Sequence, residues 1–340
     1  MLTRILSLAL FVLLFLGIAA SAAEWVLWYE QPAERWLEAL PVGNGRLGAM
    51  VFGGVAQERL ALNESTVWAG APRDRHDHQP AREHLAEIRR LFFEGRYTEA
   101  RDLCGKHLLG RRDSYGTHLP MADLFLAFEH PEGVVSGYRR QLDIATGLAR
   151  VEYAVGGVHF VREVLASHPD NVLAVRLSCD KPGALSFSVK LNGGALPSQV
   201  QAKDDTTLVI RGDARETKHS DGTTGVSFEG WVRVLAEGGR VEADGDRLCV
   251  EGADSVTLLV VAKVFCINHS SACLCADQLE VAARSSFAQL RQAHVADHRA
   301  LFDRVDLDLG GAEATSRPID QRLANLRVGS DDSQLAALFF

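Results

Sequence analysis

The sequence has 340 residues, of which 47% are hydrophobic and 24% charged, and it carries a formal net charge of −8 at pH 7. This length and apolar content suffice for one large core or two modest domains. The acidic balance, without basic clusters, argues against nucleic acid or an anionic membrane surface as a partner. It is compatible with a neutral substrate.

The N-terminus has the pattern of a secretory signal peptide. Arg4 precedes an apolar run at residues 5–18 and small residues at 19–23. The run is too short for a membrane-spanning helix. We therefore expect residues 1–23 to be removed and the product to be periplasmic or extracellular, with an uncleaved anchor as the alternative.

The glycines at residues 43–48 satisfy the G-x-G-x-x-G pattern of dinucleotide-binding proteins. That fold needs a hydrophobic strand before the first glycine and a helix at the last. Here Pro41 stands before the pattern, and the short apolar run at residues 49–54 indicates a strand after it. We therefore expect no nucleotide, and no other cofactor.

Residues 80–109 have a helical period, in which Leu85, Ile88 and Leu91 recur on one face. Gly95 interrupts the pattern, which predicts two short helices joined at residues 94–96.

Strands are predicted from Leu119 onward. The clearest hairpin covers residues 149–164, because apolar residues alternate on both sides of Gly156 and Gly157. Further short strands are predicted at residues 172–177, 185–191, 207–211, 226–236, 240–243, 248–251 and 256–264. Short strands separated by turn residues predict an antiparallel β-sandwich rather than a parallel sheet.

The C-terminal part returns to a helical period. One helix of up to about 25 residues is predicted from Asp277 towards Leu301, and a short strand at residues 305–311. The tail from Arg317 begins another helix that reaches Phe340 without a cap. We expect the chain to stop inside a further helical domain.

The cysteines and histidines do not predict a metal site. Six cysteines are too few for a disulfide framework in this chain, and no paired C-x-x-C motif indicates zinc. His76, His78 and His84 lie in a charged segment without the i, i+4 spacing of a zinc pair. We expect buried or incidental thiols, with any disulfide among the last three of Cys104, Cys179, Cys249, Cys266, Cys273 and Cys275.

Several stretches resemble the N-terminal part of glycoside hydrolase family 95, the inverting α-L-fucosidases. They are residues 27–29 (LWY), 32–33 (PA), Trp36, 39–54 (ALPVGNGRLGAMVFGG), 62–70 (LNESTVWAG), 114–124 (SYGTHLPMADL) and 298–305 (HRALFDRV). One departure is Ala122, where the family usually has glycine. It should cost little unless that position requires a positive φ.

The resemblance implies a mainly β fold. A large antiparallel β-sandwich, or super-sandwich, with a short helical insertion would cover residues 24–275. A helical linker would follow at 276–312, and the truncated start of an α/α barrel at 313–340.

The resemblance also implies that the catalytic residues lie in the barrel beyond residue 340. Inversion needs a carboxylic acid and a base roughly 6.5–9.5 Å apart. In the family these are a Glu and an Asp assisted by asparagines, so we expect no catalytic pair here and an inactive 340-residue chain.

Five residues are candidates for the substrate rim or the domain interface. Glu64 would either contact the barrel or the sugar, or satisfy a tight loop together with Asn63. Trp68 would either stack on a sugar face or pack at the domain junction. The five are Asn63, Glu64, Trp68, His118 and Asp123.

The remaining candidates lie in loops. His118 and Asp123 flank a turn at Pro120, which is either a rim loop near the substrate or a structural loop. Arg46, between glycines, is expected to anchor a carboxylate across the sandwich.

Two functions remain open at this point. The first is an exported glycosidase acting on terminal α-L-fucose, or on the similar L-galactose, in oligosaccharides. The second is a free-standing sandwich that binds carbohydrate without cleaving it. The expected partners are a fucosylated glycan and the barrel of the same protein, with no nucleic acid and no membrane after signal cleavage. The apolar C-terminus at residues 336–340 favours the first.

Overall fold

The computed structural model describes residues 25–70, 81–109, 116–223, 225–265, 272–310 and 316–339. The predicted signal peptide lies outside these residues. No helix among the described residues combines the length and the apolar character needed to cross a bilayer.

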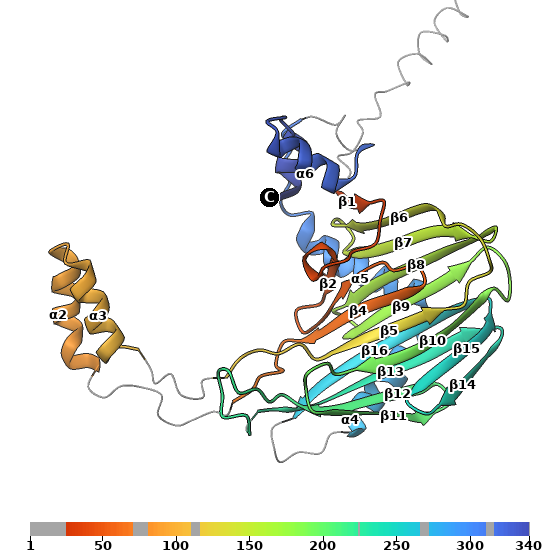
Figure 1. The fold of residues 1–340 in the computed structure, drawn as a ribbon, viewed down its shortest axis with the longest axis horizontal. Coiled ribbons are helices and arrows are strands. Elements are labelled where there is room, and N and C mark those ends of the chain that lie inside the picture. The colour runs from red at the N-terminus through yellow and green to blue at the C-terminus, as the bar shows by residue number, and fades with distance from the viewer. Residues whose placement is uncertain are drawn as a thin grey trace, which may run out of the picture.

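Two antiparallel sheets form the body of the protein (Figure 1). The strands of the first sheet are β1 (Val26–Tyr29), β6 (Ser136–Asp143), β7 (Leu148–Val155), β8 (Val158–Ser167), β9 (Val172–Cys179), β11 (Ser198–Asp204), β12 (Thr207–Asp213), β13 (Ser227–Glu237) and β16 (Ser255–Phe265). Their spatial order is β1-β6-β7-β8-β9-β16-β13-β12-β11.

The second sheet has seven strands. They are β2 (Leu40–Gly43), β3 (Leu47–Val51), β4 (Gln57–Glu64), β5 (Ala122–Phe128), β10 (Leu185–Asn192), β14 (Arg240–Asp244) and β15 (Arg247–Ala253). Their order is β14-β15-β10-β5-β4-β3-β2. The predicted antiparallel sandwich is confirmed. Ala122 lies in β5 without a positive φ, so alanine costs no backbone strain there.

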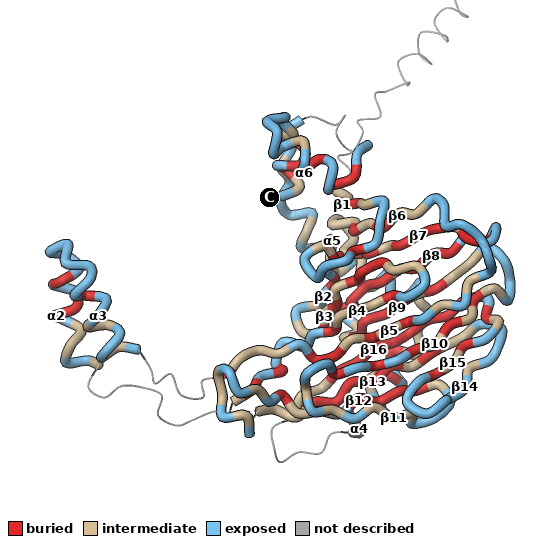
Figure 2. Tube along the Cα trace, in the orientation of Figure 1, coloured by how far each residue is buried: buried red, intermediate tan, exposed pale blue. Residues whose placement is uncertain are grey.

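The core fills the space between the sheets. Leu60 and Leu62 of β4 and Leu124 of β5 are at most 1% exposed. Their neighbours along each strand are more exposed. This is the period of two that a half-buried strand requires. Figure 2 shows the buried positions running along both sheets.

The first sheet is buried on its outer face as well. Residues 256–262 of β16 are all buried, because α4 (Ala272–Ala282) and α5 (Phe287–Phe302) cover this face. Leu279 and Leu290 of these helices pack in one cluster with Trp231 and Leu259 of the sheet. A strand covered on both faces reads as a continuous apolar run.

The prediction of one long helix here is wrong. The chain breaks between α4 and α5, where the Ser286 side chain accepts a hydrogen bond from the backbone N–H of Gln289 at 3.3 Å. The Gln289 side chain in turn accepts from the backbone N–H of Ser286 at 2.8 Å. This capping box begins a new helix.

The two predicted helices at residues 80–109 are confirmed as α2 (Ala81–Phe93) and α3 (Tyr97–His107). Gly95 between them has a φ of 75°, which glycine adopts without a Cβ clash.

The tail differs from the prediction in two respects. Residues 305–310 form no strand, and Val305 and Leu309 are exposed. The tail contains two helices, α6 (Ile319–Arg327) and α7 (Ser333–Phe339). The buried Arg322 joins them through bonds to both carboxylate oxygens of Asp332, at 2.8 and 2.7 Å. Helix α6 contacts β1.

Candidate functional site

Glu64 ends β4 and is only 1% exposed. One carboxylate oxygen accepts hydrogen bonds from the backbone N–H and the hydroxyl of Thr66, each at 2.7 Å. The other accepts from Nε of Arg46 at 3.0 Å. Both oxygens are therefore held by the local loop.

Arg46 makes the expected contact with a carboxylate. Glu64 belongs to the same sheet as β3, which follows Arg46, so this ion pair does not cross the sandwich. A second nitrogen of Arg46 donates to the carbonyl of Ala262 on β16, at 3.3 Å. That bond joins the two sheets.

Trp68 and His118 lie beside Glu64. Their rings meet edge to face with centroids 5.7 Å apart, and the two residues pair as an isolated antiparallel bridge. Nε2 of His118 lies 3.0 Å from the Glu64 carbonyl, and Nε1 of Trp68 donates to the carbonyl of Ser65 at 3.2 Å. Trp68 is 47% exposed.

Gly116 permits this contact between segments distant in sequence. Its φ is 77°, and a Cβ there would overlap the carbonyl oxygen of Ala69. Only glycine lets the backbone approach the loop so closely.

Asn63 and Asp123 lie on the other face of the same sheet. Asn63 is exposed opposite Gly48. Asp123 pairs across the strands with Ala61 and accepts two bonds from Arg59, at 2.9 and 3.0 Å. Because alternate residues of a strand face opposite sides, the sheet separates these two residues from Glu64. The carboxylates of Glu64 and Asp123 therefore do not share one opening, and each has its own guanidinium.

Asp123 lines an open hollow of about 310 Å³ on the outer face of the second sheet. The hollow is not predictable from the sequence, although Trp36, Pro120 and Ala122 belong to the stretches that resemble family 95. Its lining residues include Trp36, Arg59, Leu119, Pro120, Ala195 and Leu196.

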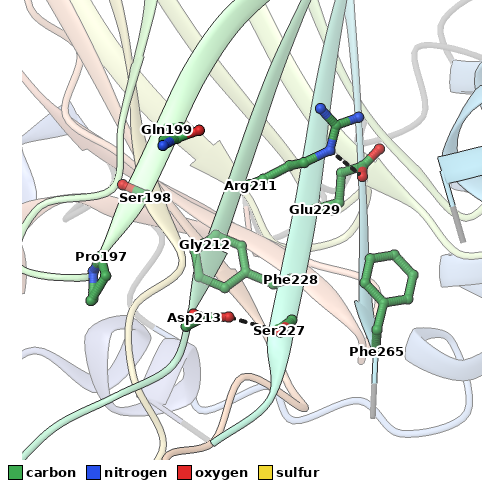
Figure 3. A pocket seen from close by; sticks show the side chains of 10 residues that line it. All are labelled: Pro197, Ser198, Gln199, Arg211, Gly212, Asp213, Ser227, Phe228, Glu229 and Phe265. Atoms are coloured by element: carbon green, nitrogen blue, oxygen red, sulfur yellow. Dashed lines mark hydrogen bonds and ion pairs between the residues drawn. The ribbon is translucent and has the colours of Figure 1, made fainter. Parts of the chain in front are cut away.

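A second hollow, of about 590 Å³, lies over β11, β12 and β13 (Figure 3). In it Glu229 accepts from Nε of Arg211 at 2.8 Å and from the indole N–H of Trp231. Asp213 accepts from the Ser227 hydroxyl at 2.7 Å. Glu229 is 3% exposed, so its carboxylate is a structural acceptor rather than an accessible base.

No metal or disulfide chemistry emerges from the described part of the chain. Three or more His, Cys, Asp or Glu side chains do not converge anywhere in it. His84 stacks on His107, whereas His76 and His78 lie outside the described residues. The cysteines at positions 104, 179, 249 and 275 are free thiols, and burial raises the pKa of Cys275 to about 12. The side chains of Cys266 and Cys273 are not described.

Comparisons with known proteins agree with this architecture. Residues 27–264 match the family model described as glycosyl hydrolase family 65, N-terminal domain. Residues 286–340 match the model described as glycosyl hydrolase family 95 catalytic domain. The fold and these matches define the protein as a β-sandwich domain of the glycoside hydrolase class, joined to a segment that matches a catalytic domain.

The chain belongs to the family whose model matches residues 27–264, described as glycosyl hydrolase family 65, N-terminal domain. It is 33% identical to Alpha-L-fucosidase 2 of Arabidopsis thaliana over 341 residues, which cover 91% of this chain and 40% of the relative. It is 25% identical to Probable alpha-fucosidase A of Aspergillus oryzae, covering 94% of this chain and 46% of the relative. The chain thus spans less than half the length of these curated relatives.

A solved structure supports the fold alone. The putative kojibiose phosphorylase from human microbiome superimposes with a TM-score of 0.53 at 9% identity, covering 85% of this chain and 39% of that chain. The domain boundaries predicted at residues 275 and 312, and the roles of the five candidate residues, stay predictions.

Proposed function

We propose that this chain is the N-terminal part of an exported α-L-fucosidase, which hydrolyses terminal α-L-fucosyl linkages in oligosaccharides with inversion. The similarity to Alpha-L-fucosidase 2 carries the proposal, because it extends over 91% of the chain. The match of residues 286–340 to the family 95 catalytic domain supports it.

The sandwich would serve as scaffold in this enzyme. Glu64 and Asp123 are engaged by Arg46 and Arg59 on opposite faces of the second sheet, so neither is free to protonate a leaving group or to activate water. An inverting acid and base stand roughly 6.5–9.5 Å apart around one sugar. We place that pair in the catalytic domain of the complete protein.

The test compares the 340-residue chain with the protein extended to include the whole family 95 catalytic domain. Both are assayed on p-nitrophenyl α-L-fucoside, α-L-galactoside and β-L-fucoside. We expect hydrolysis of the α-L-fucoside by the extended protein alone, with β-L-fucose as the first product seen by proton NMR.

Each part of the proposal has its own contradicting result. First release of α-L-fucose would refute inversion, and preference for the α-L-galactoside would reassign the sugar. An extended protein that binds fucosylated oligosaccharides without cleaving them would be a binding protein. Export is tested by N-terminal sequencing of the secreted protein, which should begin near residue 24.

A further inference from the structure

The 3₁₀ helix η1 (Trp36–Glu38) presents two large apolar side chains to solvent. Trp36 is 55% exposed and Leu37 is 84% exposed, and no residue of η1 is buried. Single exposed apolar residues are ordinary on protein surfaces, whereas a patch beside a hollow marks an interaction site.

The exposure of η1 is imposed by buried contacts. Arg140, which is 2% exposed, donates to the carbonyl of Gln31 and to the carbonyl of Glu38, each at 2.7 Å. Its guanidinium lies 4.0 Å from the centroid of the Tyr29 ring. At the surface, Arg35 donates from Nε to Glu38 at 2.7 Å. The segment is thus fixed in place with its apolar side chains outward.

The hollow beside Trp36 is lined in part by apolar side chains. Leu119 and Leu196 line it and also pack against the sandwich core. Arg59 and Asp123 line the same hollow and form their two-bond ion pair there. Protein interfaces combine apolar and polar groups in this way.

The polar residues that line the hollow are less suited to a sugar. Arg59 and Asp123 bond each other, and Oδ1 of Asn192 accepts from the Gly194 N–H at 2.9 Å. Glu216 accepts from the N–H of His219 at 3.0 Å. These groups are already engaged locally, whereas a sugar must replace its hydration by new hydrogen bonds.

The η1 segment is joined through Arg140 of β6 to Tyr29 of β1, the strand that the catalytic-domain segment contacts. Helix α6, within the family 95 match, contacts β1. Asp320 in its first turn and Glu38 of η1 both act electrostatically on Arg140. Figure 1 shows α6, β1 and β2 at the same end of the sandwich. The tail helices also carry exposed apolar side chains, namely Leu323, Leu326 and Phe339.

We propose that η1 and the hollow beside Trp36 form the surface on which the family 95 catalytic domain docks within the same protein. The inference rests on the proposed function in one respect, because it requires that the complete protein contain the catalytic domain. The relatives supply the occupant, because this chain covers 40% of Alpha-L-fucosidase 2 and its residues 286–340 match the family 95 catalytic domain.

Hydrogen exchange read by mass spectrometry tests the proposal. The 340-residue chain is compared with the extended protein, and peptides containing residues 36–38 and 193–196 are followed. We expect exchange at least about tenfold slower in the extended protein, because docking removes these amides from solvent. The control is the loop with Val134 and Val135, which are 89% and 42% exposed and should exchange equally in both.

Matched variants give a second readout. W36S/L37S should leave the melting temperature of the 340-residue chain unchanged and lower that of the extended protein by at least about 3 °C. V134S/V135S should change neither. Equal effects of W36S/L37S in both proteins, or equal exchange at residues 36–38, would overturn the proposal.

Any other occupant of this surface would give a different exchange result, and each such result would overturn the proposal that the catalytic domain docks there. Protection of residues 36–38 in the 340-residue chain by a fucosylated oligosaccharide would assign the surface to sugar. Protection that rises with concentration of that chain would assign it to a second copy. Loss of α-L-fucosidase activity refutes only the proposed function, since exchange protection does not depend on the substrate.

Discussion

Replacement of Glu64 distinguishes a structural carboxylate from one that contacts substrate. The side chain is 1% exposed and accepts three hydrogen bonds, two from Thr66 and one from Arg46. Glu64→Ala removes all three acceptors. Glu64→Gln keeps the shape and one carbonyl oxygen but removes the charge.

The expected loss follows from what each donor can do afterwards. The Thr66 backbone N–H would lose its partner in a part-buried hydrogen bond, which costs about 1–3 kcal/mol if water does not replace it. The exposed Thr66 hydroxyl can turn to water. The Arg46 side chain is 35% exposed, so its charge is rehydrated and the lost ion pair adds only about 1 kcal/mol. We expect Glu64→Ala to cost about 2–4 kcal/mol and Glu64→Gln about 1–2 kcal/mol.

Urea unfolding of the 340-residue chain measures this loss, and kcat/KM of the extended protein measures the functional effect. The structural interpretation predicts lower stability with kcat/KM within about twofold of the parent for the folded protein. A Glu64→Gln variant of unchanged stability whose kcat/KM falls more than about tenfold would refute it.

Three further predictions concern the interior. Arg162→Met should lower the free energy of unfolding, measured in urea, by about 3–5 kcal/mol, because it leaves the buried Glu58 carboxylate without its ion-pair partner. The double variant E58Q/R162M should recover most of that loss. A cost below about 1 kcal/mol would show that the carboxylate is satisfied without its arginine. Leu290→Ala should cost about 2–5 kcal/mol, since Leu290 is 1% exposed beneath α5, and an unchanged thermal midpoint would contradict the helix packing. Burial lowers the pKa of His130 from its ordinary 6.5. As pH falls, His130 is therefore protonated in the unfolded state before it is protonated in the folded state. Its contribution to the free energy of unfolding should be complete above pH 6.5 and should decline below that pH. Burial lowers the pKa of His294 in the same direction. His130→Gln should flatten this decline in urea midpoints, and an equally steep decline would exclude His130 as a cause.

The secondary structure was predictable wherever the pattern is local and strong. The hairpin of β7 and β8 and the pair α2 and α3 were found from periodicity and glycines. The edge strand β11 was missed because Ser198–Asp204 is polar and half exposed, and an edge strand needs no apolar alternation. Ser286 and Gln289 gave a capping signal for the helix break, which the apolar period overrode.

The strand predicted at residues 305–311 shows the opposite error. Alternating Val305, Leu307 and Leu309 have the period of a strand, yet no strand pairs with them in the described structure. Alternation makes a strand possible, and a partner must supply the hydrogen bonds.

The candidate site was predictable only in part. Glu64 and Trp68 are close in the sequence. The fold also brings His118, which lies 54 residues after Glu64, into contact with the Glu64 carbonyl. It also separates Asn63 and Asp123 from Glu64 by the thickness of a sheet. Neighbouring positions on a strand face opposite ways, so proximity in sequence did not mean a shared site.

The sequence by itself determined the sandwich class, the export signal pattern and the resemblance to family 95. These depend on local periodicity, turn residues and short ordered motifs. Only the tertiary structure decided the order of the strands, the engagement of Glu64 by Arg46 and of Asp123 by Arg59, and the outward position of Trp36. Strand order and burial arise from pairings between residues far apart in the chain, and a single sequence does not reveal those pairings.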